Sequence, residues 1–299
     1  MKRVVSISLG SSKRNHAVEL EMGGYLCRVE RIGTDGDMSA MVRLIAELDG
    51  KVDAFGLGGM DLYVFAGKRR YTLREAKKVA AAAQKTPLVD GSGLKNTLER
   101  QVISYLKENT NLLDNSPQVL MMSGADRFGM AEALEAAACR VTYGDLVFAV
   151  GIPVPLRSLK ALDSVARVLA PIVCQFPLAM LYPTGKKQEE NKPKAPALFA
   201  QAAIVAGDFH FIRRYMPENM SGKIVITNTT TAEDVALLKS RGVVTLVTTT
   251  PELNSRSFGT NVMEALLVAV SGKGQELSPV EYSKLLEQIN FVPRIAEMS

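Results

Sequence analysis

Short apolar runs alternate with amphipathic segments along the first third of the chain. The strand-like runs in this part are residues 4–9, 17–20, 25–29, 52–57 and 87–89. Residues 38–48 and 94–107 carry apolar positions at helical spacing. The glycine pair at 23–24 separates two strand-like runs, which predicts a hairpin. This part of the chain therefore predicts a mixed α/β unit.

A second series of strands and helices follows the polar, turn-rich residues 111–117. Its strand-like runs are residues 119–122, 140–143, 203–206, 223–227 and 243–248. Its helical segments are residues 130–138, 156–169, 232–241 and 261–270. Strands that alternate with helices form a parallel sheet covered by helices. We therefore predict an α/β fold with a Rossmann-like, doubly wound parallel sheet at 116–272 and an N-terminal mixed α/β substrate domain at 1–115.

Two helix starts have the Ser/Thr-x-x-Glu pattern of a capping box. Thr72 with Glu75 predicts a helix that runs to about residue 84. Ser278 with Glu281, and Pro279 at the first helical position, predicts a last helix within 273–299.

The composition narrows the class of protein. The chain has 299 residues with 47% hydrophobic and 22% charged residues, which is typical of globular proteins of about two domains. Three well-separated cysteines and two histidines argue against a disulfide framework and against a cysteine- or histidine-rich metal centre, so we expect no metal.

The charge pattern and the apolar stretches argue against nucleic acids and membranes as partners. The net charge of +5 comes from basic residues that are mostly interleaved with acidic ones, so no nucleic-acid partner is expected. The longest uncharged stretch, residues 168–185, contains three prolines and does not predict a spanning helix. Because the first residues do not form a signal peptide, we expect a cytoplasmic protein.

The strongest motif begins at Gly124, between a predicted strand and a predicted helix. Residues 124–129, GADRFG, have the outline of the dinucleotide fingerprint, in which helix-start amides hold a pyrophosphate. Asp145 ends the next strand 21 residues after Gly124, near the spacing of a ribose-binding carboxylate. No Arg or Lys directly follows Asp145, which favours NAD, with NADP as the alternative.

Asp126 occupies the position of the fingerprint's middle glycine. Its carboxylate would repel a phosphate, but Arg127 could offset that charge by contacting a phosphate oxygen. Alternatively, Asp126 could cap the helix, and the loop could be a structural turn that binds no nucleotide.

Polar residues also follow other predicted strands. The segment from Thr227 to Thr229 ends a strand, where it could line the cofactor site. Alternatively, Thr229–Thr231 could cap the next helix. The residues predicted to bind the cofactor are Gly124, Ala125, Asp126, Arg127, Phe128, Gly129, Asp145, Thr227, Asn228 and Thr229. Asp90, in an Asp-Gly-Ser-Gly turn, could act as a base, a proton relay or a hydroxyl anchor. Lys68 could stabilise negative charge or belong to a solvated surface.

Three blocks in the same order resemble the shikimate and quinate 5-dehydrogenases. They are the Asp90-Gly91-Ser92-Gly93 turn, the segment VLMMSGADRFGMAEAL and the segment IVITNTTT. The chain as a whole resembles a bacterial group labelled quinate 5-dehydrogenase. The resemblance implies a substrate domain, a Rossmann domain and a C-terminal helix at 273–299 that returns to the first domain. It also implies a catalytic Lys–Asp pair, for which Lys68 and Asp90 are the candidates.

Two classes of function follow. The first is an NAD(P)-dependent oxidoreductase that transfers hydride between a nicotinamide and a cyclic polyhydroxy acid, with a carboxylated polyol as substrate. The second is a non-catalytic nucleotide- or metabolite-binding Rossmann protein, or a transferase with another nucleotide cofactor, since the fold alone does not fix the chemistry. The sequence leaves a homodimer open.

Overall fold

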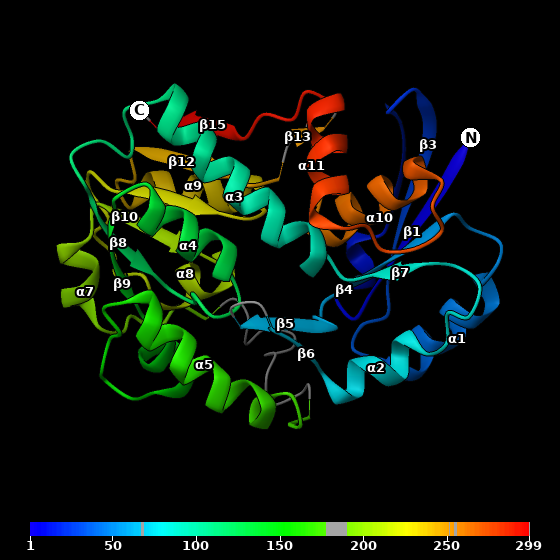
Figure 1. Ribbon diagram of the computed structural model, residues 1–299, viewed down its shortest axis with the longest axis horizontal. Coiled ribbons are helices and arrows are strands. Elements are labelled where there is room, and N and C mark those ends of the chain that lie inside the picture. The colour runs from blue at the N-terminus through cyan, green and yellow to red at the C-terminus, as the bar shows by residue number, and fades with distance from the viewer. Residues whose placement is uncertain (67–68, 178–189, 251, 254–255, 299) are drawn as a thin grey trace.

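A computed structural model of the chain describes residues 1–66, 69–177, 190–250, 252–253 and 256–298. Two large sheets lie side by side, the first in blue and cyan on the right of Figure 1 and the second in green to red on the left. Both sheets are mainly parallel and have helices packed against them, which confirms the predicted α/β class. Among the described residues, no helix has the length and apolar character needed to cross a membrane.

The first sheet has the strand order β2-β3-β1-β4-β7. Its strands are β1 (Lys2–Ser8), β2 (His16–Met22), β3 (Tyr25–Gly33), β4 (Ala54–Gly58) and β7 (Leu88–Val89). Only β2 is antiparallel to its neighbour. The predicted hairpin between β2 and β3 is confirmed, and its two turn glycines have the positive φ angles, 58° and 79°, that a tight hairpin turn requires.

Successive residues of β1 supply two cores, as the period of a strand requires. Val5 and Ile7 face helices α1 (Met38–Leu48) and α2 (Arg74–Ala80). Val4 faces α10 (Thr260–Ser271), α11 (Pro279–Gln288) and the first half of α3 (Ser92–Asn109). Both faces of the first sheet are therefore covered, one of them by helices from the far end of the chain.

A short hairpin between the two sheets has no counterpart in the sequence prediction. It consists of β5 (Tyr63–Ala66) and β6 (Arg69–Thr72), and lies near the centre of Figure 1. Because Thr72 ends β6, the predicted capping box at this residue is wrong; Leu73 is the N-cap of α2 and makes no side-chain cap bond. The capping box of Ser278 and Glu281 is confirmed at the start of α11.

The second sheet has the order β15-β12-β11-β10-β8-β9. Its strands are β8 (Gln118–Met121), β9 (Arg140–Tyr143), β10 (Ile204–Gly207), β11 (Ile224–Thr227), β12 (Thr245–Thr248) and β15 (Arg294–Glu297). All pairs are parallel except β12 with β15. In chain order the parallel strands run 2-1-3-4-5, so the third strand lies beside the first and not beside the second. The antiparallel edge strand β15 was not predicted.

Helices cover both faces of this sheet and enclose two further cores. They are α4 (Phe128–Ala136), α5 (Leu159–Val173), α7 (Pro196–Gln201), α8 (Phe209–Tyr215) and α9 (Ala232–Ser240). The remaining elements are a 3-10 turn η1 (Ser12–Arg14), a π-helical turn η2 (Leu146–Val150), and the short strands β13 (Glu252–Leu253) and β14 (Arg256–Ser257).

Helix α3 joins the two halves of the molecule. Leu94 and Leu98 pack in the core of the first sheet, whereas Ile103 and Leu106 pack in a core of the second. Helix α10 lies within the range 116–272 assigned from the sequence to the nucleotide-binding domain, but it packs against the first sheet. Helix α11 packs there too, before β15 returns to the second sheet.

Candidate ligand-binding site

The direction in which successive strands are added to the second sheet reverses between β8 and β10. After β8 the chain passes to β9 on one side, and the next strand, β10, lies on the other side. Ligands of open α/β sheets bind outside the carboxyl ends of the strands at such a switch point. The loop at 122–127 and the residue Asp208 follow the carboxyl ends of β8 and β10, and they are the centre of the site described here.

The glycine loop and Asp145 lie together, as their spacing of 21 residues suggests. The Asp145 carboxylate accepts hydrogen bonds from the amides of Gly124 at 3.0 Å and Ala125 at 2.8 Å. Burial raises the pKa of Asp145 to about 6, against the opposing effect of these two amides. A Cβ atom at Gly124 would lie 2.8 Å from Tyr143 and Leu162, so this position requires glycine. The protein's own carboxylate thus engages the first amides of the loop.

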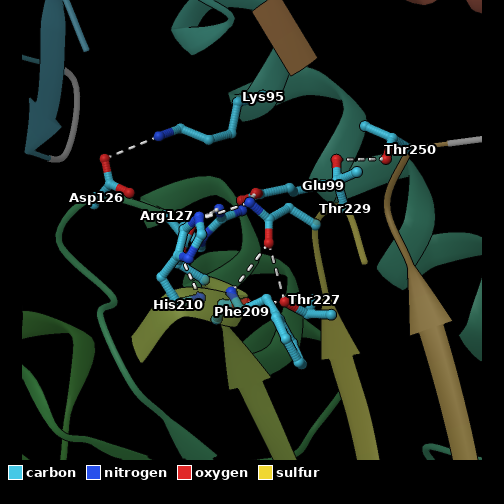
Figure 2. A network of polar contacts seen from close by, with 12 residues as sticks. Lys95, Glu99, Asp126, Arg127, Phe209, His210, Thr227, Thr229 and Thr250 are labelled. Atoms are coloured by element: carbon cyan, nitrogen blue, oxygen red, sulfur yellow. Dashed lines mark hydrogen bonds and ion pairs between the residues drawn. The ribbon is translucent and has the colours of Figure 1, made fainter. Parts of the chain in front are cut away.

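Asp126 extends from the loop toward α3. Its carboxylate accepts a hydrogen bond from Lys95 Nζ at 2.9 Å, and the two side chains are 28% and 11% exposed (Figure 2). Burial disfavours the Lys95 ammonium, but the charges of Asp126 and Asp61 outweigh burial and raise its pKa above the ordinary value. The charge that was expected to repel a phosphate is therefore paired with a lysine.

Arg127 lies in the interior, with only 3% of its side chain exposed. It forms an ion pair with Glu99 on α3 (Figure 2). It also donates a hydrogen bond of 2.9 Å to Asp208. Although burial disfavours both charges, Arg127 lowers the pKa of Asp208 to about 2, and the carboxylates raise the pKa of Arg127. Burial raises the pKa of Glu99, against Arg127 and Lys95. In this arrangement Arg127 pairs with two carboxylates of the protein itself.

The predicted residues at the end of β11 belong to the same network. Asn228 donates from Nδ2 to Asp208 at 2.9 Å and accepts from the amide of Phe209 at 3.0 Å. Thr227 donates to the Gly207 carbonyl, and Thr229 shares a hydrogen bond of 3.1 Å with Thr250 (Figure 2). The structure therefore brings the ends of β8, β10 and β11 together around Arg127.

Phe128 and Gly129 contribute to packing at the start of α4. Phe128 is 4% exposed and lies in a core of the second sheet. A Cβ atom at Gly129 would lie 2.5 Å from the carbonyl oxygen of Asn96, so the absence of a side chain allows α4 to approach α3 closely.

A small pocket opens between α3, the β8–α4 loop and the β5–β6 hairpin. It is lined by Phe65, Ser92, Lys95, Asn96, Glu99, Asp126, Arg127, Phe128 and Gly129. Its cavity volume is about 10 Å³, roughly the space of one water molecule, far smaller than the ~300–1,000 Å³ of most ligand pockets. Two buried atoms of its lining residues, Glu99 Oε2 and Arg127 Nε, have no hydrogen-bond partner within the described part of the chain.

Of the two predicted catalytic residues, the structure describes Asp90. Asp90 is 7% exposed and accepts hydrogen bonds from the amides of Leu62 and Tyr63 and from the amide and hydroxyl of Ser92. It holds Ser92, a pocket residue, at the start of α3. Lys68 lies outside the described residues.

Sequence reasoning did not find Glu99 or select Asp208. Glu99 lies four residues after Lys95, so both project from one side of α3, which is the available signal. Asp208 directly follows the last residue of β10, the position at which strand ends carry ligand contacts.

No curated protein matches the sequence. The NAD-dependent malic enzyme of Thermotoga maritima is 10% identical with a TM-score of 0.42, and the match covers 95% of this chain and 75% of that one. Glutamate dehydrogenase of Thermus thermophilus is 12% identical with a TM-score of 0.42, covering 97% and 73%. A galactofuranose binding protein is 13% identical with a TM-score of 0.35, covering 97% and 99%. With every TM-score below 0.5, these likenesses carry no functional argument.

Two family models together span almost the whole described chain. The Domain of unknown function DUF8753 matches residues 3–90, which form the first sheet without its α3, α10 and α11 layer. The Domain of unknown function DUF8754 matches residues 93–298, more than half of the chain. The chain therefore belongs to the DUF8754 family.

Proposed function

We propose that this protein binds a small anionic metabolite at the switch point of the second sheet, with Lys95 as the residue that receives the anionic group. The carboxylated polyols and nucleotides expected from the sequence both fall in this class. One observation carries the proposal: five charged side chains from three separate parts of the chain meet at this point. They are Lys95, Glu99, Asp126, Arg127 and Asp208.

The burial of these charges supports a role beyond stability. Removing a charge from water costs several kcal/mol, and well-packed apolar residues of similar volume often stabilise a fold as well or better. Here Arg127 and Glu99 are 3% and 1% exposed, and each has a polar atom without a hydrogen-bond partner among the described residues. Charged groups with perturbed pKa values in a pocket are candidates for a functional site.

Of the two cations in this cluster, Lys95 and Arg127, Lys95 has the more solvent-exposed counter-ion. Its counter-ion Asp126 is 28% exposed, whereas the partners of Arg127 are more deeply buried. An anionic ligand group that enters the pocket would compete with Asp126 for the ammonium. Because the pKa of Lys95 is raised, the lysine is charged throughout the neutral range.

A pair of variants with opposite expected effects tests the proposal. The protein is titrated calorimetrically with nicotinamide dinucleotides, adenine mononucleotides, quinate and shikimate. For a ligand that binds, Lys95→Gln should weaken affinity at least tenfold because the cation is lost. Asp126→Asn should tighten it several-fold because the competing carboxylate is removed. Glu132→Gln, which breaks an ion pair with Arg100 on the neighbouring helix, is the matched control and should leave affinity unchanged.

Two results would contradict the proposal. One is a shift of affinity in the same direction in Lys95→Gln and Asp126→Asn, since competition requires opposite signs. The other is the absence of binding by any of these compounds to a sample whose folding is verified by circular dichroism.

An NAD(P)-dependent oxidoreductase of the quinate and shikimate type is the second candidate. The position of Asp145 supports it, because this carboxylate lies beside the glycine loop at the end of the second strand. In this function Asp145 would exchange its loop amides for a ribose hydroxyl when the cofactor binds. The test is quinate-dependent formation of NADH, followed by fluorescence, and its loss in Asp145→Ala. Quinate binding without NADH formation would favour the first candidate.

A further inference from the structure

A polar group lies at the carboxyl end of the first sheet, on the face that α10 covers. Val4 of β1 and Val29 of β3 pack in the core beneath α10. Residues two positions apart in a strand share a face, so Ser6, Ser8 and Arg31 lie on this same side, beyond the apolar core. The hydrogen bond of 2.9 Å from Asn261 at the start of α10 to Ser6 Oγ is consistent with this placement.

The charge of Arg31 is only partly compensated. Its guanidinium donates to the carbonyl of Ser11 at 3.1 Å and to Ser8 Oγ at 3.2 Å. A guanidinium has five N–H donors, and no ion pair with a carboxylate forms here among the described residues. Burial and the like charge of Arg14 both lower the pKa of Arg31. Arg14 lies close by, because its carbonyl oxygen is 2.9 Å from Nδ1 of His16, the residue paired with Arg31 on the neighbouring strand. Two neighbouring cations without a shared counter-ion attract an anion.

Glycines allow the backbone to pack closely beside Ser8 and Arg31. A Cβ atom at Gly10 would lie 3.1 Å from Arg31 Nη2 and 3.3 Å from Ser8 Oγ. A Cβ atom at Gly58, at the end of the adjacent strand β4, would lie 3.0 Å from Ser8 Cβ. The backbone of both segments can therefore approach this group closely.

We propose that Arg31 and Arg14, together with the hydroxyl of Ser8, bind the phosphoryl group of a phosphate monoester. Guanidinium groups recognise phosphate oxygens through paired, charge-assisted hydrogen bonds. A dianion at this point would neutralise the two arginines. This site lies on the first sheet and does not depend on the function proposed for the second sheet.

The phosphate site also adjoins the second sheet. His16, whose Cα is paired with that of Arg31, has its ring 6.5 Å from the ring of Phe258. The carbonyl of Phe258 accepts a hydrogen bond from Thr229 Oγ1 at the end of β11. A phosphorylated ligand held by Arg31 would thus have its remaining atoms near the boundary between the two sheets.

Inorganic phosphate is the first probe, titrated into the protein by calorimetry, with sodium chloride at equal ionic strength as the blank. We expect saturable binding in wild type, with affinity weakened at least tenfold in Arg31→Gln and about threefold in Arg14→Gln. Arg28→Gln is the matched control, because Arg28 belongs to the same strand but faces the other side and pairs with Glu19 and Glu30. It removes the same charge and should not change phosphate affinity.

The outcomes separate a binding site from a structural arginine. Phosphate affinity equal in wild type and in a folded Arg31→Gln overturns the proposal, as does an equal loss in Arg28→Gln, which would show a general charge effect. If Arg31→Gln does not fold, the exposed Arg14→Gln and the conservative Arg31→Lys decide: unchanged affinity in both overturns the proposal. Glycerol phosphate that binds no better than glycerol would also overturn it.

Discussion

Two turns of this molecule expose backbone amides in the manner of an anion site, and each is filled by a carboxylate of the protein itself. In the β8–α4 loop, Asp145 accepts from the amides of Gly124 and Ala125. At the start of α3, Glu264 of α10 accepts from the amides of Gly91 at 2.6 Å and Leu94 at 3.1 Å. The first carboxylate comes from the adjacent strand end, whereas the second comes from a helix more than 170 residues away in sequence.

The two carboxylates differ in their surroundings. Glu264 is fully buried, also accepts a hydrogen bond of 2.5 Å from the Tyr282 hydroxyl, and has a pKa raised to about 8 by burial and by Asp90. Asp145 is 8% exposed, and its pKa is raised only to about 6. Glu264 has three donors and no exposure, whereas Asp145 has two donors and slight exposure, so we expect a ligand to open the β8–α4 loop more readily than the start of α3.

Removal of the two carboxylates should give the largest difference. Glu264→Ala leaves two buried amides and the Tyr282 hydroxyl without an acceptor, and should lower the free energy of unfolding by about 3–5 kcal/mol. Asp145→Ala should cost about 2 kcal/mol, because Ala125 is only partly buried. Urea unfolding followed by circular dichroism measures both. Equal losses would remove the distinction between a structural cap and a loop that can open.

The pH dependence of stability should separate the same two groups. A pKa raised in the folded state stabilises the fold below the group's ordinary pKa, and this contribution is lost as the pH rises through the raised value. Between about pH 4.5 and 6, the deprotonation of both groups lowers the free energy of unfolding as the pH rises. Between about pH 6 and 8 only Glu264 lowers it, by up to ~1.4 kcal/mol per pH unit.

Unfolding midpoints measured across this range test the assignment. Glu264→Gln should abolish the decline between about pH 6 and 8, and Asp145→Asn should leave it in place. A decline above pH 6 that persists in Glu264→Gln would assign it to another group.

The smallest effect is expected at Asp126, which lies in the same loop as Gly124 but binds a lysine and not an amide. Its ion pair with Lys95 is partly exposed, so Asp126→Asn should change the free energy of unfolding by less than about 1 kcal/mol. This variant is the control for the first comparison. A loss as large as that of Asp145→Ala would mean that charge in this loop, and not the satisfaction of its amides, sets stability.

The sequence predicted local features better than long-range ones. The five parallel strands of the second sheet, the β2–β3 hairpin and the cap of α11 follow from apolar runs, glycine pairs and a capping pattern within a few residues of each other. The β5–β6 hairpin was missed because Tyr63–Ala66 and Arg69–Thr72 lack an alternating apolar pattern. The strand β15, with only half-buried and exposed residues, gave no apolar run.

The part of the site that depends on local sequence features was also predictable. The loop at 124–129, Asp145 and Thr227–Thr229 come from recognisable strand ends, and they do lie near one another. Two charges of the loop have their partners on α3: Glu99 pairs with Arg127, and Lys95 pairs with Asp126. The contact between α3 and α4 cannot be predicted from any local sequence pattern. Helix α10 is buried at nine consecutive positions, 262–270, so its sequence does not indicate which sheet it covers.

The position of α3 has a consequence for how the chain can be divided. The two family models meet between residues 90 and 93, directly before this 18-residue helix. A fragment ending at 90 would contain every strand of the first sheet but none of α3, α10 and α11, and would expose to water the face that those helices cover. The fragment should therefore aggregate when expressed alone. Although separate family models match the two segments, we expect them to fold as a single cooperative unit.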